Sequence, residues 1–244
     1  MILTCLGSGS SGNCYLLTAS NGDTLIIEAG VNFTEVKKAL NFNLRKIVGC
    51  VVSHEHGDHS KYLPDVLSCG IKVLGLKEAF RNVKQKVFCV EVEPLHGYKI
   101  GGFKVFTIPV CHDVPCLGFV IEHQEMGKLL FITDTMMLEY KIPHLNHIMI
   151  EANYSDEILQ ENIDNGLVFP FMRDRLMHSH MEIKTTANVL KANDISEVNE
   201  IILLHLSGRN SDAGLFKDTI AKAVGKPVYI ANRTLKINLD KEPF

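Results

Sequence analysis

Long hydrophobic runs are missing from this sequence of 244 residues. No run approaches the roughly 20 apolar residues that a membrane-spanning helix needs, and no basic stretch followed by an apolar one marks an export signal. The seven cysteines form no C-x-x-C pair and mostly lie within apolar runs, which favours reduced, buried thiols over a disulfide framework. We therefore expect a cytoplasmic protein with no membrane partner.

Runs of Lys and Arg are also missing, and the net charge is −3. A duplex nucleic acid as the main partner is therefore less expected than a small substrate. Linker-like, repeated and low-complexity stretches are absent as well. Hydrophobic residues make up 46% and charged residues 22% of the chain, as in ordinary globular proteins. These observations predict a single domain spanning residues 1–244.

The literal pattern G-x-G-x-x-G at residues 7–12 does not predict a dinucleotide site. That fingerprint has to open a helix, whereas here the apolar segments 13–18 and 24–28 flank the Asn21-Gly22 turn. Such a pattern predicts a β-hairpin. The Gly/Ser loop is then either a plain strand connection or an amide-rich wall beside a site.

Periodicity along the rest of the chain predicts a layered α/β protein with helices outside packed sheets. Strands are expected at 2–6, 13–18, 24–28, 48–52, 71–74, 87–92, 103–110, 118–122, 128–132, 201–204, 228–230 and 235–237. Helices are expected at 33–42, 62–67, 77–83, 155–162, 169–177, 182–193 and 212–224.

The segment 54–59, His-Glu-His-Gly-Asp-His, follows the apolar run 48–52 and so lies on the loop that leaves a buried strand. Neutral imidazole and ionised carboxylate are ligands of zinc, manganese and iron. A solvated polar loop is the alternative, but the spacing H-x-H-x-D-H is far more specific than a lone histidine. The segment predicts a metal site, with Glu55 and Gly57 as spacers and Gly57 permitting a tight turn.

Further candidate ligands follow three of the expected strands. His112, Asp134 and His205 each stand directly after an apolar run, which is where open α/β sheets gather their sites. Any one of them alone would be read as a capping or surface residue. Together with the segment 54–59 they complete a metal site. The histidines without such a context are His96, His123, His144 and His147.

This succession, H-x-H-x-D-H and then a lone His, a lone Asp and a final His, resembles the metallo-β-lactamase superfamily over essentially the whole chain. The resemblance implies an αββα sandwich, with two mixed sheets and outer helices, and two divalent metal ions. It also implies the ligand sets: His54, His56 and His112 for one ion, Asp58, His59 and His205 for the other, and Asp134 as the bridge. Zinc is the expected metal, with manganese or iron as alternatives.

The family usually has Asp where this chain has Glu28. The carboxylate is kept, so a bond to a ligand histidine is expected, with a different geometry.

A second motif narrows the subgroup. Ser179-His180-Met181-Glu182 has the S-x-x-E pattern of a capping box, which predicts His180 in the first turn of a helix, where free amides favour an anion. The motif resembles that of ribonuclease Z and WalJ/YycJ-like proteins, whose histidine faces the scissile phosphate. His205-Leu206-Ser207 resembles their H-x-S segment. His178 is expected to be a bystander.

The combination of residues 7–13, 112–114, 179–181, 205–207 and 210–212 resembles the anti-Pycsar phosphodiesterases, which open cyclic pyrimidine and purine mononucleotides. This implies a two-metal phosphodiesterase that counteracts cyclic-nucleotide immune signalling. The residues expected to act on the substrate are His180, Asp58 and Asp134, and those expected to support the site or face the substrate are Glu28, Asn13 and Ser207.

Other functions and assemblies remain open at this point. The first alternative is a nuclease of the WalJ/YycJ or ribonuclease Z kind, although no insertion resembles the tRNA-binding arm of ribonuclease Z. The second alternative is a lactone, lactam or thioester hydrolase, which does not need His180. The third alternative is a binding protein with a degenerate site. Relatives of this kind form two-fold homodimers. The apolar segment 154–177 either packs in the protein's own core or forms such an interface.

Overall fold

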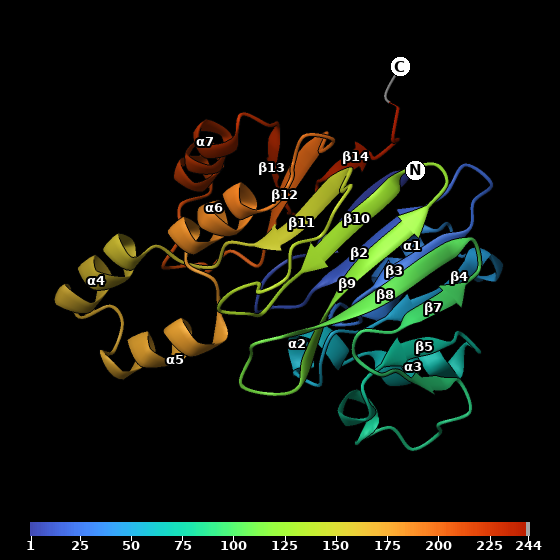
Figure 1. Ribbon diagram of the computed structural model, residues 1–244. Coiled ribbons are helices and arrows are strands. Elements are labelled where there is room, and N and C mark those ends of the chain that lie inside the picture. The colour runs from blue at the N-terminus through green and yellow to red at the C-terminus, as the bar shows by residue number, and fades with distance from the viewer. Residues whose placement is uncertain (243–244) are drawn as a thin grey trace.

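Two seven-stranded β-sheets lie face to face at the centre of the molecule (Figure 1). The computed structural model describes residues 1–242. The first sheet has the order β14 (Lys236–Asn238), β1 (Ile2–Gly7), β2 (Cys14–Thr18), β3 (Thr24–Ile27), β4 (Ile47–Val51), β5 (Val73–Gly75), β6 (Cys89–Glu91). The second sheet has the order β13 (Val228–Ile230), β12 (Glu200–Leu204), β11 (His147–Glu151), β10 (Gly127–Ile132), β9 (Cys116–His123), β8 (Phe103–Val110), β7 (Gly97–Ile100).

Both sheets are mixed. The strands from β3 to β6 pair in parallel, and β14, β1, β2 and β3 pair antiparallel. In the second sheet β10 to β13 are parallel, whereas β7 to β10 are antiparallel. Because β8 and β10 are each antiparallel to β9, they run in the same direction. The carboxyl ends of β8, β10, β11 and β12 therefore meet at one edge of the sheet.

Helices lie outside the two sheets: some cover the outer faces, and others form a lobe that projects from the sheets (Figure 1). They are α1 (Phe33–Ala39), α2 (Gly57–Ser60), α3 (Leu63–Ser68), α4 (Asp156–Asp164), α5 (Phe171–Ser179), α6 (Ile183–Ala192) and α7 (Ala213–Val224), with 3-10 turns η1 (Leu44–Lys46) and η2 (Lys77–Phe80). Apolar side chains of α1 and α3 pack on the first sheet, and those of α6 and α7 pack on the second. The predicted αββα arrangement is confirmed.

The core between the sheets is built from inward-facing residues of both. Tyr15 of β2 meets Phe131 of β10 with ring centroids 5.6 Å apart, and Phe131 stacks on Phe119 at 6.2 Å. Each fully buried side chain of this size contributes about 1.5–3 kcal/mol through removal from water. The core holds the two sheets in one relative position, so that loops from both can share a site.

Some predicted elements differ from the structure. The helix expected at 77–83 is only the short 3-10 turn η2, and the expected strand 87–92 is reduced to β6. Strand β7 was not predicted, because it is a short edge strand that begins with Gly97. The dinucleotide fold is excluded as expected, since β2 and β3, not a helix, follow the Gly/Ser loop.

The capping box predicted at residues 179–182 is wrong. Ser179 is the last residue of α5, and its Oγ donates a hydrogen bond to the carbonyl of Arg175 at 2.6 Å. The N-cap of α6 is Glu182, whose carboxylate accepts from the amides of Lys184 and Thr185. His180 therefore lies in the extended link between two helices and not in a helical first turn.

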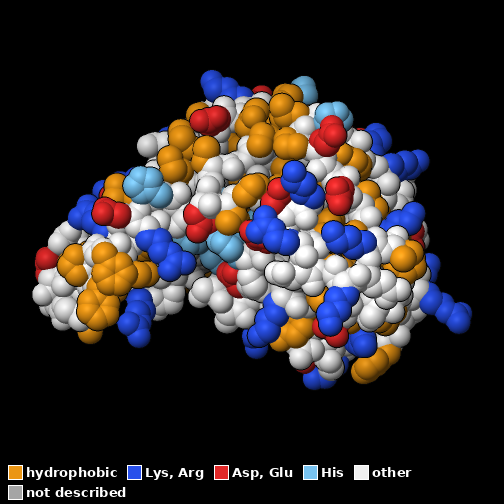
Figure 2. Space-filling model, turned by 90° about the horizontal axis from the view of Figure 1, so that it is seen from below, with side chains coloured by type: hydrophobic (Ala, Val, Ile, Leu, Met, Phe, Trp, Pro, Cys, Tyr) orange, Lys and Arg blue, Asp and Glu red, His pale blue; other side chains and the backbone are white. Residues whose placement is uncertain are grey.

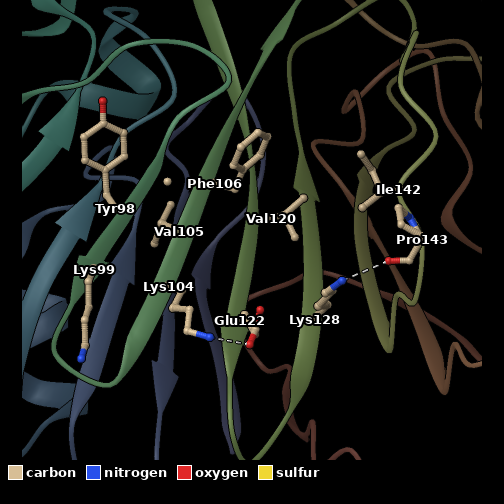
Figure 3. Close-up of a pocket in the computed structure, with 11 residues that line it drawn as sticks. Tyr98, Lys99, Lys104, Val105, Phe106, Val120, Glu122, Lys128, Ile142 and Pro143 are labelled. Atoms are coloured by element: carbon tan, nitrogen blue, oxygen red, sulfur yellow. Dashed lines mark hydrogen bonds and ion pairs between the residues drawn. The ribbon is translucent and has the colours of Figure 1, made fainter.

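Part of the outer face of the second sheet carries no helix (Figure 1). Figure 3 shows the groove that results, with Phe106 and Val120 between Lys104 and Lys128, and Ile142 and Pro143 beyond Lys128. Its volume is about 570 Å³, and Lys104 pairs with Glu122 at 3.0 Å. The groove shares no residue with the candidate ligands. Of the helices in residues 1–242, none combines the length and the apolar character needed to cross a bilayer.

Candidate metal centre

The candidate ligands come together at the edge where the strands end. Residues 54–59 leave β4 and turn into the short helix α2. His112 follows β8, Asp134 follows β10, and His205 follows β12 directly. Chain segments that are far apart in the sequence thus deliver imidazoles and carboxylates to one place, as the strand directions require.

One group consists of three histidines around a carboxylate. Ligand atoms of His54, His56, His112 and Asp134 all lie within 4.8 Å of one another. Nε2 of His54 and Nε2 of His112 lie 3.7 and 3.8 Å from Oδ2 of Asp134. Nε2 of His112 lies 3.3 Å from Nδ1 of His56. These are the residues predicted to hold the first ion.

A second group shares the same carboxylate. Ligand atoms of Asp58, His59, Asp134 and His205 also lie within 4.8 Å of one another. Nε2 of His59 is 3.3 Å from Oδ2 of Asp134, and Nδ1 of His205 is 3.2 Å from Oδ1. Nε2 of His205 is 3.3 Å from Oδ2 of Asp58. Asp134 is common to both groups, which is the position that a bridging carboxylate requires.

The contacts within the first group fit a cation better than direct hydrogen bonds. His54 has no exposure to solvent, yet its Nε2 has no hydrogen-bond partner among residues 1–242. The distances of 3.7 and 3.8 Å to Asp134 exceed the usual 2.7–3.2 Å of an N–H···O bond. A buried ring nitrogen that lacks a partner is costly, and a metal ion supplies that partner. The residues present therefore fit a divalent metal.

Burial and charge set the protonation of the ligands. Burial, reinforced by His59, holds the pKa of His54 well below its ordinary value, so the ring is neutral, as metal binding requires. Burial alone would raise the pKa of Asp134, but His205 and His59 hold it well below its usual range. Asp134 therefore keeps its charge in a site from which solvent is almost excluded.

Polar groups behind the ligands hold the histidine rings in place. Oγ of Ser53 lies 2.8 Å from Nδ1 of His54. Glu28 has no exposure, accepts a hydrogen bond from the Ser53 amide at 3.3 Å, and lies 3.5 Å from Nδ1 of His59. Such partners orient a ligand ring and raise its basicity. Glu28 thus keeps a carboxylate behind His59, although the distance from its Oε2 to Nδ1 of His59 exceeds that of a normal hydrogen bond.

The Gly/Ser loop forms a wall of the site and is fixed by Asn13. Oδ1 of Asn13 accepts from the amide of Gly9 at 2.8 Å, and its Nδ2 lies 3.2 Å from the carbonyl of Asp58 and 3.0 Å from Nε2 of His59. Ser10 of this loop borders the metal pocket. Of the two roles left open for the loop, the wall beside the site is the one that the structure bears out.

Glu151, which the sequence reasoning missed, links His180 to the centre. Its side chain has no exposure, and its Oε1 lies 2.7 Å from Nδ1 of His180 and 3.3 Å from Nδ1 of His205. Its Oε2 accepts from the amides of Thr135 and Met181. Ligand atoms of Asp134, Glu151, His180 and His205 form a third group within 4.8 Å.

His180 lines the metal pocket, whose volume is about 160 Å³. Burial alone would lower the pKa of His180, but the Glu151 carboxylate outweighs burial and holds that pKa above its ordinary value. His178 instead points its ring at the carbonyl of Asp174 and is exposed. His180 therefore owes its place to Glu151 and not to a helix dipole.

Backbone strain accompanies the site. Glu28, Asp134 and His205 adopt φ values of 67°, 47° and 52°, in the left-handed region that non-glycine residues seldom occupy. Each of them stands directly after or close to the end of a strand. Such strain, when the surrounding structure maintains it, concentrates at functional sites. Figure 2 shows the outside of this edge as a hollow with histidine side chains at its centre, beside a lobe rich in hydrophobic side chains.

Comparison with known proteins decides the family. A family profile described as a beta-lactamase superfamily domain matches residues 24–206, which contain every candidate ligand. The chain belongs to the metallo-β-lactamase superfamily. The predicted family and the predicted hydrolase fold are thereby confirmed, whereas the cyclic-nucleotide subgroup stays a prediction.

Two curated relatives and one solved structure illustrate the relationship. The chain is 23% identical to exodeoxyribonuclease YycJ of Bacillus anthracis, over 98% of this chain and 94% of that protein. It is 31% identical to ribonuclease Z of Lactobacillus acidophilus, over 43% of this chain and 39% of that protein. The metallo-β-lactamase fold protein YhfI of Bacillus subtilis superposes with a TM-score of 0.75 at 16% identity, covering 97% of this chain and 99% of that one.

Three further residues singled out in the sequence lie outside the ligand cluster of this metallo-β-lactamase member or play another part in it. Gly57 is not required for a tight turn, because its φ is not positive and an added Cβ would meet nothing within 4 Å. Ser207 does not contact the ligand cluster directly, but its Oγ accepts from the amides of Arg209 and Asn210 and shapes the loop after His205. His147 is fully buried away from the centre, bonded to Glu200 at 2.6 Å.

Proposed function

We propose that the protein is a metal-dependent phosphodiesterase that hydrolyses 3′,5′-cyclic mononucleotides, and so counteracts cyclic-nucleotide immune signalling. The observation that carries the phosphodiester chemistry is the His180–Glu151 pair at 2.7 Å beside the two ligand groups. Hydrolysis of a lactam or lactone at such a centre does not need this pair. Cleavage of a phosphodiester has to expel an alkoxide, which is a poor leaving group, and a positioned proton donor assists that step.

The chain's own residues would divide the work as follows. One cation would be held by His54, His56 and His112. The other would be held by Asp58, His59 and His205, and Asp134 would be a ligand of both. When bound, the cations supply Lewis-acid polarisation of the phosphoryl group and a nucleophile from water at neutral pH. The donor set suits zinc, and manganese or iron are accommodated.

His180 would act on the substrate itself. Because Glu151 accepts the proton on Nδ1, the ring is held in one orientation and Nε2 is left for the substrate. From the wall of the metal pocket, Nε2 would stabilise charge on the phosphoryl oxygens or protonate the departing 3′ or 5′ oxygen. Glu151 is a positioning residue, since it acts through His180.

The size of the adjoining space supports a small substrate. The metal pocket of about 160 Å³ continues, through residues that line both, into a cavity of about 250 Å³. Taken together, the two spaces reach the lower end of the roughly 300–1,000 Å³ that small-molecule sites occupy. A space of this size suits a single nucleotide.

A nuclease is the second candidate, and two observations favour it. The similarity to exodeoxyribonuclease YycJ extends along nearly the whole chain. A hollow of about 530 Å³ also borders Asp58, and the cations Lys61 and Arg233 line it. Those cations would suit the phosphate of a neighbouring nucleotide.

A substrate panel separates these candidates. Purified protein is loaded with Mn²⁺ or Zn²⁺ and offered 3′,5′-cyclic mononucleotides, bis-p-nitrophenyl phosphate, single-stranded DNA and a β-lactam. We expect turnover of the cyclic nucleotides and of bis-p-nitrophenyl phosphate. An Asp134→Ala variant, which lacks the shared carboxylate, is the control for contaminating hydrolases. Degradation of DNA without turnover of cyclic nucleotides would overturn the leading proposal and establish the nuclease.

We also propose a two-fold homodimer formed through the lobe of α4 and α5, which projects from the sheets (Figure 1). Leu167, Phe169 and Phe171 in this lobe expose 61, 72 and 68% of their surface, so they do not pack in the chain's own core. An exposed apolar patch of this kind is typical of an interface. Light scattering on the wild-type protein and on a Phe169→Ser/Phe171→Ser variant tests it, and a wild-type monomer would contradict it.

A further inference from the structure

The cavity of about 250 Å³ beside the metal pocket has two kinds of wall. Met172 and Leu176, one turn apart on α5, give an apolar side. Asn153, Asn210 and Ser207, from the loops after β11 and β12, give a polar side. A nucleobase requires both kinds of wall, since its faces are apolar and its edge carries donors and acceptors.

The fold leaves one acceptor of Asn153 without a partner. Its Nδ2 donates to the carbonyl of His205 at 2.7 Å, which fixes the orientation of the amide. Its Oδ1 is buried and has no hydrogen-bond partner among residues 1–242, although Asn153 is only 5% exposed. A buried acceptor without a partner in a folded protein calls for an explanation, and an N–H group of a ligand is one.

Asn210 complements this acceptor. Asn162 donates from its Nδ2 to Oδ1 of Asn210 at 3.0 Å, so the Asn210 amide is oriented with its Nδ2 turned elsewhere. Asn210 is only 7% exposed and lines the same cavity. One cavity is therefore bordered by an amide with an unpaired acceptor and by a second amide with a donor to offer.

Arg175 and His180 connect this cavity to the chemistry. Both line the cavity and the metal pocket, and Arg175 is an exposed cation on α5. A guanidinium there suits a phosphate between the two spaces. A ligand that places its phosphate in the metal pocket, beside Arg175, extends its base into the cavity.

We propose that the cavity between α5 and the loop after His205 is the nucleobase subsite of the enzyme, with Met172 and Leu176 against the face of the base and Asn153 and Asn210 at its edge. This inference rests on the proposed phosphodiesterase function and names the part of the substrate that the protein reads. Bases with an N–H donor at the edge, such as the amino group of adenine or cytosine, match the free acceptor of Asn153.

The test compares ligands that differ only in the base. Inhibition of bis-p-nitrophenyl phosphate hydrolysis is measured with adenosine 5′-monophosphate, with cytidine 5′-monophosphate and with ribose 5-phosphate, which has no base. The wild-type enzyme should bind at least one nucleotide about tenfold or more tightly than ribose 5-phosphate, a ratio that corresponds to about 1.4 kcal/mol. In Leu176→Trp, where the indole fills the cavity, this ratio should fall to near one.

The matched control is Met177→Trp. Met177 is the next residue of α5, is 44% exposed and does not line the cavity, so the same substitution should leave the ratio as in the wild type. Circular dichroism confirms that both variants are folded. Equal inhibition by ribose 5-phosphate and both nucleotides in the wild type, or an unchanged ratio in Leu176→Trp, would overturn the subsite. Failure of the proposed function looks different, because the wild-type enzyme would then turn over no cyclic mononucleotide, whichever ligand inhibits hydrolysis of bis-p-nitrophenyl phosphate.

Discussion

Nδ1 of His180 lies 2.7 Å from Oε1 of Glu151, a carboxylate without exposure to solvent. The two residues come from different elements, since Glu151 ends β11 and His180 lies between α5 and α6. This contact, and not a helix terminus, fixes the histidine at the rim of the metal pocket.

Replacing His180 by Ala should abolish most turnover and leave the metals in place. The loss of a positioned proton donor lowers kcat about 10²–10⁴-fold. Elemental analysis of the purified variant should show the wild-type metal content, because the two predicted ligand sets do not include His180. His178→Ala is the matched control, since His178 is exposed two residues earlier, and it should retain wild-type kcat. A fall in metal content on His180→Ala would make His180 a ligand and require another role for His205.

Replacing Glu151 by Gln should lower kcat by disturbing His180. The amide keeps the size of the side chain but no longer supplies the charge that orients the imidazole. Because Glu151 acts through His180, the double variant Glu151→Gln/His180→Ala should be no slower than His180→Ala alone, a strongly non-additive result. Steady-state kinetics on all three variants measures this. Additive losses would show that Glu151 serves mainly His205.

Substitution by Ala should lower stability at one glycine near the cluster and be tolerated at another. A Cβ on Gly30 would lie 1.7 Å from the carbonyl oxygen of Asp58, so Gly30→Ala has to displace the loop that carries a ligand. We expect a loss of about 1–3 kcal/mol in stability, as for other overpacked sites, and a lower metal content. Gly57→Ala, where nothing lies within 4 Å, should be tolerated. Thermal melting and elemental analysis decide, and a wild-type-like Gly30→Ala would contradict the contact.

Removal of metal should lower thermal stability. Ligand at about 100 times its dissociation constant stabilises the folded state by about 2.7 kcal/mol, which corresponds to roughly 5–11 °C for a domain of this size. Melting curves with a chelator, and after dialysis into Zn²⁺ or Mn²⁺, measure the shift. In Asp134→Ala, which lacks the carboxylate common to both groups, the shift should disappear. Identical melting of chelated and metal-loaded wild type would argue against the centre.

The cysteines should differ sharply in reactivity. Burial raises the pKa of Cys5 to about 12 and holds those of Cys50 and Cys116 well above the ordinary value. A thiolate forms only as pH approaches the pKa, so these thiols should stay unmodified by iodoacetamide from pH 7 to 9. Cys69 and Cys111 are exposed and should be alkylated in the native protein. Peptide mass spectrometry before and after unfolding measures this, and native labelling of Cys50 would contradict the buried core.

Local spacing was enough to predict the part of the site that is contiguous or follows an apolar run. The segment 54–59 carries its ligands within one turn, and Asp134 and His205 stand at the ends of unmistakable strands. Their convergence was expected from their positions after strands, and their division into two ligand sets came from the family resemblance. The two layers of helices could be predicted in the same way, from hydrophobic periodicity.

Glu151 could not be found in that way, because its importance depends on tertiary pairing. It ends β11, and the register that places Ile150 beside Ile132 of β10 brings it close to Asp134. The signal was an acid directly after the apolar run 148–150. The capping box failed for a related reason: Ser179 still belongs to the preceding helix, whose end the sequence does not mark.

The left-handed backbone at Glu28, Asp134 and His205 affects which substitutions stabilise the protein. A non-glycine residue in that conformation costs roughly 1–2 kcal/mol, so Asp134→Gly would relieve strain in the metal-free chain while it destroys the shared ligand. In the metal-free chain, stability and activity are therefore opposed at these positions. A lineage in which the metal no longer binds would replace these strained residues early and keep the sandwich intact.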